Sequence, residues 1–218
     1  MVILFNLLSF FVFATQVFGH IENPSSNAVT LESYELGVQE YIDGTSHEVS
    51  RSFKGWIDAT LSYLPAHAQI IEIGSGFGRD ARYIESLGFR VERTDAAEAF
   101  VSFLQGKGFA ARTFNILTDA FDAQYDLLFA NAVFLHFTPE ELETVFAKVH
   151  TALNKDGILA FTVKRGEGQE WSNAKLGRPR YFCYWSENRI LPLLERAGFE
   201  VIYLGGDEVF LQIIAKLK

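Results

Sequence analysis

The chain has 218 residues, 49% of them hydrophobic, which is enough for one domain with a sizeable core and short for two. Its formal net charge of -8 offers no basic surface to a phosphate backbone, so a nucleic-acid partner is not expected, and small molecules or protein side chains fit better. Cys183 is the only cysteine, which excludes an internal disulfide and a cysteine-based metal cluster, and no metal site is predicted.

Residues 1–19 carry no charged side chain, and three interpretations of them are open. A signal peptide would suit Val17 and Gly19 at a cleavage site, but no basic residue lies near its start. A membrane anchor would be long enough, yet Arg51 is the first Lys or Arg available to orient it. The third interpretation is a start codon assigned too early, with the working protein beginning near Val29. Residues 1–28 would then lie outside a single domain at 29–218.

After the polar stretch at 22–27, which is typical of a flexible junction, residues 31–43 and 48–64 have the apolar spacing of helices. From residue 68 onward, strand patterns alternate with helix patterns. Pro192 lies in the last predicted helix and either kinks it or delays its start. Strands are predicted at 68–73, 89–95, 111–116, 125–133 and 157–163, and helices at 79–87, 98–107 and 186–197, with another beginning at Pro139 after the N-cap Thr138.

The tail at 199–218 differs from the rest, because two β-rich runs are separated only by Gly205, Gly206 and Asp207. This is typical of a hairpin, so the last strand is predicted to be antiparallel. Alternating strands and helices predict an α/β fold. We therefore expect a doubly wound, mostly parallel, seven-stranded Rossmann-like sheet with an antiparallel last strand and helices on both faces.

The stretch "IIEIGSGFGRD" at 70–80 joins the first predicted strand to a helix through a glycine-rich turn. A turn of this kind places a ligand at the carboxyl end of the strand and at the helix N-terminus. The dinucleotide pattern G-x-G-x-x-G would require glycine at position 79, where Arg79 stands, so a pyrophosphate is not favoured. Alternatively, the glycines serve only a tight turn.

Two acidic residues accompany this turn. Asp95 ends the second predicted strand, where a carboxylate can accept hydrogen bonds from both hydroxyls of a ribose, although it can also cap the following helix. Glu72 lies inside an apolar strand, and a buried carboxylate is costly unless it is paired. A cationic ligand amine would explain it, and a structural arginine is the competing explanation.

At these positions the chain resembles the class I S-adenosylmethionine-dependent methyltransferases over about residues 29–218. The segment "EIGSGFGRD" is similar to the first motif of that family, and "RTDA" at 93–96 is similar to the acidic end of its second strand. The terminal hairpin is similar to the reversed last strand that separates the family from dehydrogenases. The resemblance implies an enzyme that binds S-adenosylmethionine and transfers its methyl group by in-line displacement.

The resemblance also implies cofactor-binding roles for residues at four strand ends. Glu72 would recognise the amino group of the cofactor, and Asp95 would hold its ribose. Asn115 stands where the family usually has an Asp facing the adenine amine, and its carbonyl oxygen can accept that hydrogen bond. The remaining implied contacts are Gly74, Ser75, Gly76 and Gly78 with the methionine part, Ala96 and Ile116 with adenine, and Asn131 and Ala132 through the backbone with the ligand amine.

Candidates for the acceptor side are less well defined. Tyr34 and Tyr41 are similar to aromatic residues that close over the ligand, and ordinary helix packing explains them equally well. Methyl transfer from a sulfonium needs alignment, exclusion of water and sometimes removal of a proton. His136 follows the fourth predicted strand, and an imidazole titrates near neutrality, so His136 is either a general base or a residue that only shapes the pocket.

The segment at 164–185 mixes glycines, charges and aromatic residues, which indicates a lid over the acceptor pocket or a cover for the sheet edge. Its candidates for binding a planar or anionic acceptor are Trp171, Arg178, Arg180, Tyr181 and Tyr184. The segment "NAVF" at 131–134 lacks the two prolines of the "NPPY" signature, which argues modestly against a base or amide acceptor.

Three functions are compatible with these patterns. We expect a methyltransferase acting on a small molecule; the alternatives are a non-catalytic S-adenosylmethionine-binding module and an NAD-dependent oxidoreductase, against which Arg79 and the terminal hairpin count. Because S-adenosylmethionine is supplied in the cytosol, we favour a start near Val29 and a cytoplasmic location. Stable membrane association, or secretion, is expected only if residues 1–19 are retained.

Overall fold

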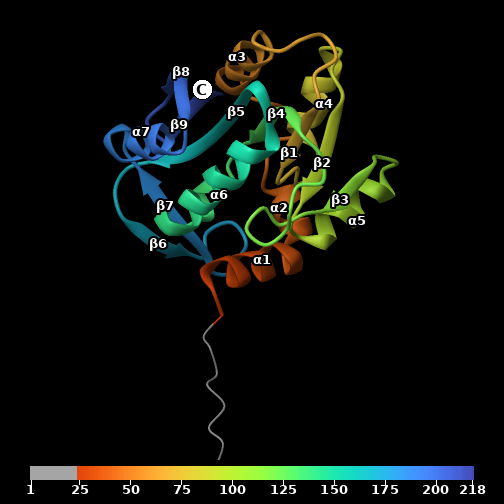
Figure 1. Cartoon of the computed structure of the whole chain (residues 1–218). Coiled ribbons are helices and arrows are strands. Elements are labelled where there is room, and N and C mark those ends of the chain that lie inside the picture. Colours follow the sequence, from red (N-terminus) through yellow and green to blue (C-terminus); the bar gives the residue numbers. More distant parts are fainter. Residues whose placement is uncertain (1–23) are drawn as a thin grey trace, which may run out of the picture.

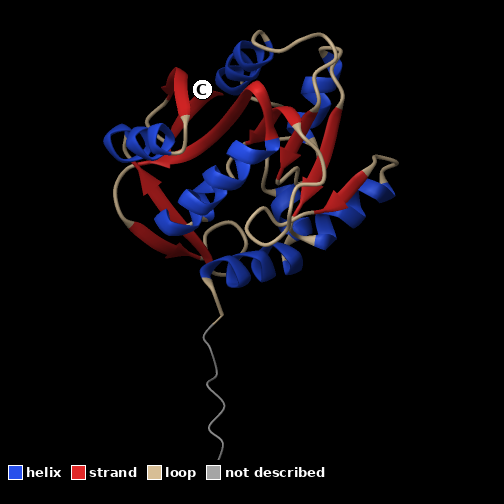
Figure 2. Ribbon diagram, viewed as in Figure 1, coloured by secondary structure: helices blue, strands red, loops and turns tan. Residues whose placement is uncertain are grey.

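The computed structural model describes residues 24–218, and the interpretations of residues 1–19 concern a segment outside them. Helices and strands alternate along the described chain (Figure 1, Figure 2). In this part of the chain, no helix combines the length and the apolar character that crossing a bilayer requires. The helices are α1 (Ser26–Leu36), α2 (Val38–Asp43), α3 (Arg51–Leu61), α4 (Arg79–Ser86), α5 (Glu98–Gly106), α6 (Pro139–Ala152) and α7 (Glu187–Arg196), with a 3-10 turn η1 (Phe134–His136). The strands are β1 (Ile70–Ile73), β2 (Val91–Asp95), β3 (Ala111–Thr113), β4 (Tyr125–Ala130), β5 (Leu153–Arg165), β6 (Gln169–Ser172), β7 (Arg180–Trp185), β8 (Phe199–Gly206) and β9 (Phe210–Leu217).

The strands form one sheet in the order β3-β2-β1-β4-β5-β7-β6, and β9 pairs with both β5 and β8. Strands β1 to β5 run parallel to one another. Strand β9 runs antiparallel to β5 and to β8, so the predicted terminal hairpin is confirmed. The sheet is therefore the predicted doubly wound, mostly parallel sheet with a reversed last strand.

The strand count differs from the prediction, because residues 24–218 contain nine strands rather than seven. The two additional strands lie in the segment at 164–185, for which the sequence predicts a lid or a cover for the sheet edge and no strand. Strands β6 and β7 form an antiparallel hairpin, and β7 continues the sheet by pairing with the end of β5 at Lys164 and Arg165. The β-favouring run "RYFCYW" forms β7, whereas the glycines and charges before it obscure the strand pattern.

The first helix also differs from the prediction. It begins at Ser26, five residues early, where the Ser25 side chain accepts a hydrogen bond from the Ala28 amide. It ends at Leu36 with Gly37 as its C-cap, and Gly37 separates α1 from α2; a Cβ at Gly37 would lie 2.8 Å from the Ser33 carbonyl oxygen, so a larger residue would crowd this position. The expected helix at 31–43 is thus two helices, and part of the expected junction at 22–27 is helical. Pro192 lies inside α7, which still begins at Glu187.

Each face of the sheet has its own hydrophobic core, because side chains alternate between the faces along every strand. On one face, Leu128 and Phe161 pack with residues of α6 and α7. On the other face, Leu127 and Phe129 pack with residues of α3 and α4, Trp56 among them. A smaller cluster joins α2 and α5 beside the glycine turn and contains Ile42, Phe77, Ala97 and Phe100. This third cluster lies next to the carboxyl ends of the parallel strands.

Candidate active site

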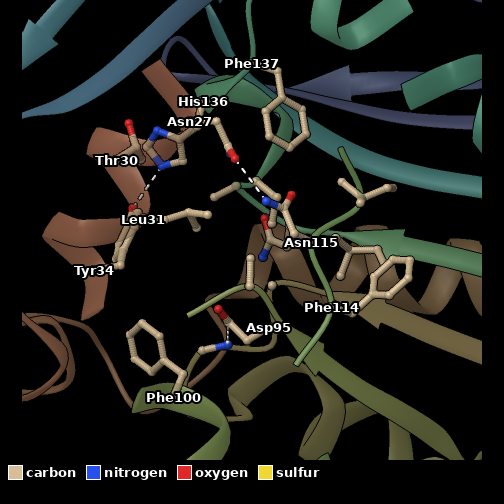
Figure 3. Close-up of a pocket in the computed structure, with 18 of the residues that line it drawn as sticks. Asn27, Thr30, Leu31, Tyr34, Asp95, Phe100, Phe114, Asn115, His136 and Phe137 are labelled. Atoms are coloured by element: carbon tan, nitrogen blue, oxygen red, sulfur yellow. Dashed lines mark hydrogen bonds between the residues drawn. The ribbon is translucent and has the colours of Figure 1, made fainter. Parts of the chain in front are cut away.

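A pocket lies at the carboxyl ends of β1, β2 and β4, where the sheet changes winding direction, the place at which α/β proteins of this kind bind ligands (Figure 3). Helix α1 covers its other side, and Figure 3 shows α1 side chains facing those of the strand ends. The lining residues are Ile73, Gly74, Gly76, Asp95, Ala96, Phe114, Asn115, Ile116, Asn131, Ala132, Val133, His136 and Phe137 from the strand ends, Tyr41 and Phe100 from α2 and α5, and Asn27, Thr30, Leu31 and Tyr34 from α1.

The glycine turn forms the floor of this pocket. Gly74 and Gly76 have φ values of 72° and 54°, which L side chains rarely adopt. A Cβ at Gly74 would lie 2.5 Å from Val133 Cγ2, and one at Gly76 would extend toward the Tyr41 ring. Gly78 does not line the pocket; it precedes α4, and its missing side chain leaves room for Leu104 of α5. Two of the three predicted glycines therefore border the ligand space directly.

Glu72 and Ser75 lie within the glycine turn region but do not line the pocket. They are only 3% and 7% exposed, and Glu72 Oε2 and Ser75 Oγ have no hydrogen-bond partner among residues 24–218. Burial, and secondarily the Asp80 carboxylate, raise the pKa of Glu72 to about 8. Arg93 is opposite Glu72 in the strand register, but its guanidinium donates to Glu85. Arg93 is thus only partly engaged: its Nε has no hydrogen-bond partner in the described chain, and the Ser75 hydroxyl and the Arg93 charge offset part of the rise in the Glu72 pKa.

Asp95 lines the pocket and is held by the backbone. Its Oδ2 accepts a hydrogen bond from the Gly76 amide at 2.8 Å, and its Oδ1 accepts one from the Ala97 amide at 2.9 Å. The N-cap residue of α5 is Ala97, so Asp95 braces the turn before the helix and is not its cap. Burial raises the pKa of Asp95 to about 6, against the effect of these amides. The carboxylate is fixed in place, with its free lone pairs available to a ligand.

The two predicted asparagines line the pocket, and each already has protein partners. Asn115 Nδ2 donates to Asn27 Oδ1 at 3.0 Å. Asn131 donates to Asp80 and accepts from the Thr162 hydroxyl, which also accepts from the Ala132 amide. Ala132 has a φ of 59°, unusual for a residue with a side chain, and strain of this kind is concentrated at functional sites. Ala96 and Ile116 lie in the pocket wall as predicted.

His136 is buried in the wall and joined to Tyr34 (Figure 3). Its Nδ1 lies 2.6 Å from the Tyr181 carbonyl oxygen, which can only accept, so Nδ1 carries the proton. Its Nε2 lies 2.9 Å from the Tyr34 hydroxyl and therefore accepts from it. Arg180 in turn donates to that hydroxyl at 3.1 Å. Burial lowers the pKa of His136 to about 3, so the imidazole is neutral at physiological pH.

The predicted acceptor residues divide into two groups. Tyr34 and Tyr41 line the pocket with their ring centroids 5.5 Å apart, and Arg180 contacts Tyr34 from behind. The other four do not line the pocket: Trp171 is 51% exposed, Arg178 pairs with Glu40, Tyr181 is buried in the main core, and Tyr184 donates to Glu170.

Sequence reasoning missed the contribution of the first turns of α1. Asn27 and Thr30 line the pocket, and Thr30 also accepts a hydrogen bond from the Tyr181 amide. Both residues belong to the stretch that we assigned to the junction or to its edge. Ser25, a favourable N-cap residue after Pro24, was the available signal for an earlier helix start. A protein beginning at Val29 would lack both this cap and Asn27.

The fold and the pocket together define an α/β protein that binds a nucleotide-like cofactor at a glycine turn. Residues 46–204 match the family profile described as a methyltransferase domain, and the chain belongs to this family. The predicted resemblance to methyltransferases is thereby confirmed. A search of curated protein sequences gives no significant match.

Solved structures with the same fold include several methyltransferases. The 1,6-didemethyltoxoflavin-N1-methyltransferase of Burkholderia thailandensis, solved with 1,6-didemethyltoxoflavin and S-adenosylhomocysteine, is 20% identical, with a TM-score of 0.68 over 91% of this chain and 93% of that chain. An S-adenosylmethionine-dependent methyltransferase of Methanosarcina mazei is 17% identical, with a TM-score of 0.63 over 72% and 95%. The glycopeptide N-methyltransferase MtfA, solved with S-adenosylhomocysteine, is 12% identical, with a TM-score of 0.62 over 78% and 91%. At these identities the likeness establishes the fold.

Proposed function

We propose that this protein transfers the methyl group of S-adenosylmethionine to a small-molecule acceptor. The observation that carries the proposal is the buried Glu72, which lies in β1 two residues before Gly74 and whose Oε2 has no hydrogen-bond partner among residues 24–218. A carboxylate is stable in such a place when a cation pairs with it, and the ammonium group of the cofactor is such a cation. The solved methyltransferases of this fold with bound S-adenosylhomocysteine support the same cofactor.

The residues of the pocket fit this cofactor. Gly76 offers open space toward Tyr41, where a Cβ would otherwise intrude, so the backbone can approach the methionine part. Asp95 would accept hydrogen bonds from the ribose hydroxyls. Ala96 and Ile116 would pack against adenine. The Asn115 side chain, which donates to Asn27 in this structure, would give up that hydrogen bond and accept one from the adenine amine. The remaining contacts would be made by Gly74 and by Asn131 and Ala132 at the end of β4; Ser75 and Gly78 would act through the shape of the turn.

When bound, S-adenosylmethionine supplies a methyl group that its sulfonium charge already activates. The chain then has to orient the acceptor and exclude water, and Tyr34 and Tyr41 lie over the pocket in positions suited to both tasks. For an acceptor that loses a proton, we propose His136 as the base. Its Nε2 is unprotonated and accepts from Tyr34, so the Tyr34 hydroxyl would pass its proton to Nε2 and take one from the acceptor. The low pKa of His136 makes it a weak base, suited to acceptors that are already acidic.

A binding and transfer experiment tests the proposal. S-adenosylhomocysteine should bind the full chain with micromolar affinity in calorimetry, and NAD should not bind. Asp95→Ala should abolish that binding, whereas Glu208→Ala, at an exposed carboxylate of the terminal hairpin, should leave it unchanged. Labelled S-adenosylmethionine offered with a broad panel of small acceptors should give labelled product. Cofactor binding without transfer to any member of the panel would favour the non-catalytic module instead. Absence of S-adenosylhomocysteine binding to the folded protein would refute the proposal.

We further propose a cytoplasmic location, because the cofactor is supplied there. Fractionation of cells producing the chain with a C-terminal tag tests this. Recovery of the tagged protein with membranes, or outside the cell, would contradict it and would favour retention of residues 1–19.

A further inference from the structure

Arg180 is a buried cation without a carboxylate partner. The residues described as buried include two arginines, Arg93 and Arg180, which are 5% and 6% exposed. Arg93 pairs with Glu85, whereas within residues 24–218 no carboxylate forms an ion pair with Arg180. The Arg180 guanidinium donates only to neutral oxygens, the Tyr34 hydroxyl and the Ala174 carbonyl, and its Nε has no partner in the described chain. A buried charge in this state is costly unless an anion joins it.

A second cation lies beside Arg180 without a carboxylate of its own. Lys175 belongs to the turn between β6 and β7, and its ammonium group lies 4.0 Å from the centre of the Tyr41 ring. Its φ of 76° is a left-handed conformation that a lysine rarely adopts, so the turn holds this side chain at a cost in backbone strain. Partial burial, and next Arg180 and Arg79, lower the pKa of Lys175. Among the described residues, Lys175 makes no ion pair.

Neither cation lines the methyl-transfer pocket itself, but each contacts a tyrosine that does. Arg180 contacts Tyr34 and Lys175 contacts Tyr41, and the two tyrosine rings form an edge-to-face pair. The same turn is fastened to the helices over the pocket, because the Ser33 hydroxyl donates to the Pro179 carbonyl oxygen at 2.7 Å. Unneutralised positive charge is thus built into the acceptor side of a chain whose formal net charge is -8.

We propose that the acceptor is an organic anion, carrying a carboxylate or a phosphate group that Arg180 binds with the help of Lys175. This inference rests on the proposed methyl transfer and names the class of acceptor for that same pocket. The guanidinium presents a planar fork of N–H donors suited to two oxygens of such a group, and Nε is already free. Because Tyr34 separates Arg180 from the pocket, the anion would displace the Tyr34 hydroxyl from Arg180 and leave that hydroxyl, still bonded to His136, to face the reacting atom.

The test measures binding of small anions to the full chain saturated with S-adenosylhomocysteine, at constant ionic strength. The probes are phenyl phosphate, benzoate and the neutral benzyl alcohol. Phenyl phosphate, benzoate or both should bind saturably, and benzyl alcohol should bind much more weakly. Tighter binding of one anion assigns the phosphate or the carboxylate as the recognised group. Arg180→Gln should weaken anion binding by at least about tenfold, Lys175→Gln should weaken it less, and Arg180→Lys should recover part of the loss.

Controls separate this inference from the proposed function. Arg196→Gln, at an exposed arginine of α7 that pairs with Glu143 and does not line the pocket, should leave anion binding unchanged. Saturable binding of S-adenosylhomocysteine without any anion binding would overturn this inference alone, whereas loss of S-adenosylhomocysteine binding would overturn the proposed function. If Arg180→Gln instead weakens the binding of S-adenosylhomocysteine, Arg180 recognises the carboxylate of the cofactor and the inference is wrong. Should Arg180→Gln fail to fold, Lys175→Gln decides, and unchanged anion affinity in that variant would count as refutation.

Discussion

Replacing Glu72 by glutamine should stabilise the ligand-free protein while it weakens cofactor binding. Burial raises the pKa of Glu72 from its ordinary value of 4.5 to about 8. The folded protein therefore keeps a proton on Glu72 between pH 4.5 and 8, whereas the unfolded chain has lost it. Stability from this residue is greatest below pH 4.5 and falls as the pH rises toward 8. Glutamine has nearly the same shape, cannot ionise, and removes this loss.

The size of the effect follows from the pKa difference. At about 1.36 kcal/mol for each pKa unit, glutamine should raise the free energy of unfolding by about 1 kcal/mol at pH 5 and about 4 kcal/mol at pH 8. Urea unfolding of the ligand-free protein, followed by circular dichroism at both pH values, measures this gain. Glu208→Gln, at an exposed position in the terminal hairpin, is the control and should change neither value. Equal stability of wild type and Glu72→Gln at pH 8 would refute the reasoning, because Glu72 would then be ionised and paired in the folded protein.

The same substitution should affect ligand binding in the opposite direction. A neutral glutamine cannot pair with the ammonium group of the cofactor, so S-adenosylhomocysteine should bind Glu72→Gln at least about tenfold more weakly at pH 8. Calorimetric titration of wild type and variant provides the comparison. A more stable variant with unchanged affinity would show that Glu72 is a structural liability of the strand and does not recognise the ligand.

Three further predictions concern the ribose position, the glycine turn and the start of α6. Affinity for S-adenosylhomocysteine, measured by calorimetric titration, should fall as the pH drops through about 6, where Asp95 gains a proton. Asp95→Asn should bind more weakly, and its affinity should not change over that pH range. Gly74→Ala should destabilise the fold by about 1–3 kcal/mol in urea unfolding, because its Cβ meets Val133 in a left-handed backbone, and the double variant with Val133→Ala should recover only part of the loss. Thr138→Ala should cost about 1 kcal/mol through the reciprocal cap with Glu141, with no change in ligand affinity; a larger loss, or altered binding, would contradict a purely structural cap.

The sheet could be predicted wherever its signals are local. Strand β4 is apolar on both faces, as an interior parallel strand must be, and the run after Thr138 contains the whole signature of a helix start. The signals failed where a partner distant in sequence decides the structure. Strand β7 pairs with β6 and also with the end of β5, and nothing within its own neighbours announces the pairing with β5. Helix α1 is a different case, because its N-cap Ser25 is a local signal that lies in a stretch whose composition is typical of a loop.

The candidate site divides in the same way. Residues at the ends of consecutive strands, such as Gly74, Asp95 and Asn131, meet in the pocket because parallel strands end at one edge of a sheet, and this follows from the order of elements alone. The contact of Tyr34 with His136 joins residues far apart in the chain, and its geometry depends on how α1 docks. The sequence therefore indicated each residue but not their hydrogen bond, nor the burial that lowers the pKa of His136.

The unpartnered polar atoms suggest how one pocket can hold two ligands in a fixed order along its length. In the described chain, Glu72 Oε2 and Ser75 Oγ are unpartnered at the glycine turn, and Arg180 Nε is unpartnered beneath the turn between β6 and β7. Glu72 is a carboxyl group that a cationic ligand would ionise, and Arg180 is a buried cation without a carboxylate partner in the described chain, so each favours a ligand of opposite charge. A cofactor with its ammonium at the glycine turn and an acceptor with its anionic group at Arg180 would each satisfy one end. If the two ligands exchanged places, the ammonium group would face Arg180 and the anionic group would face Glu72, so these two residues would orient the methyl donor toward the acceptor.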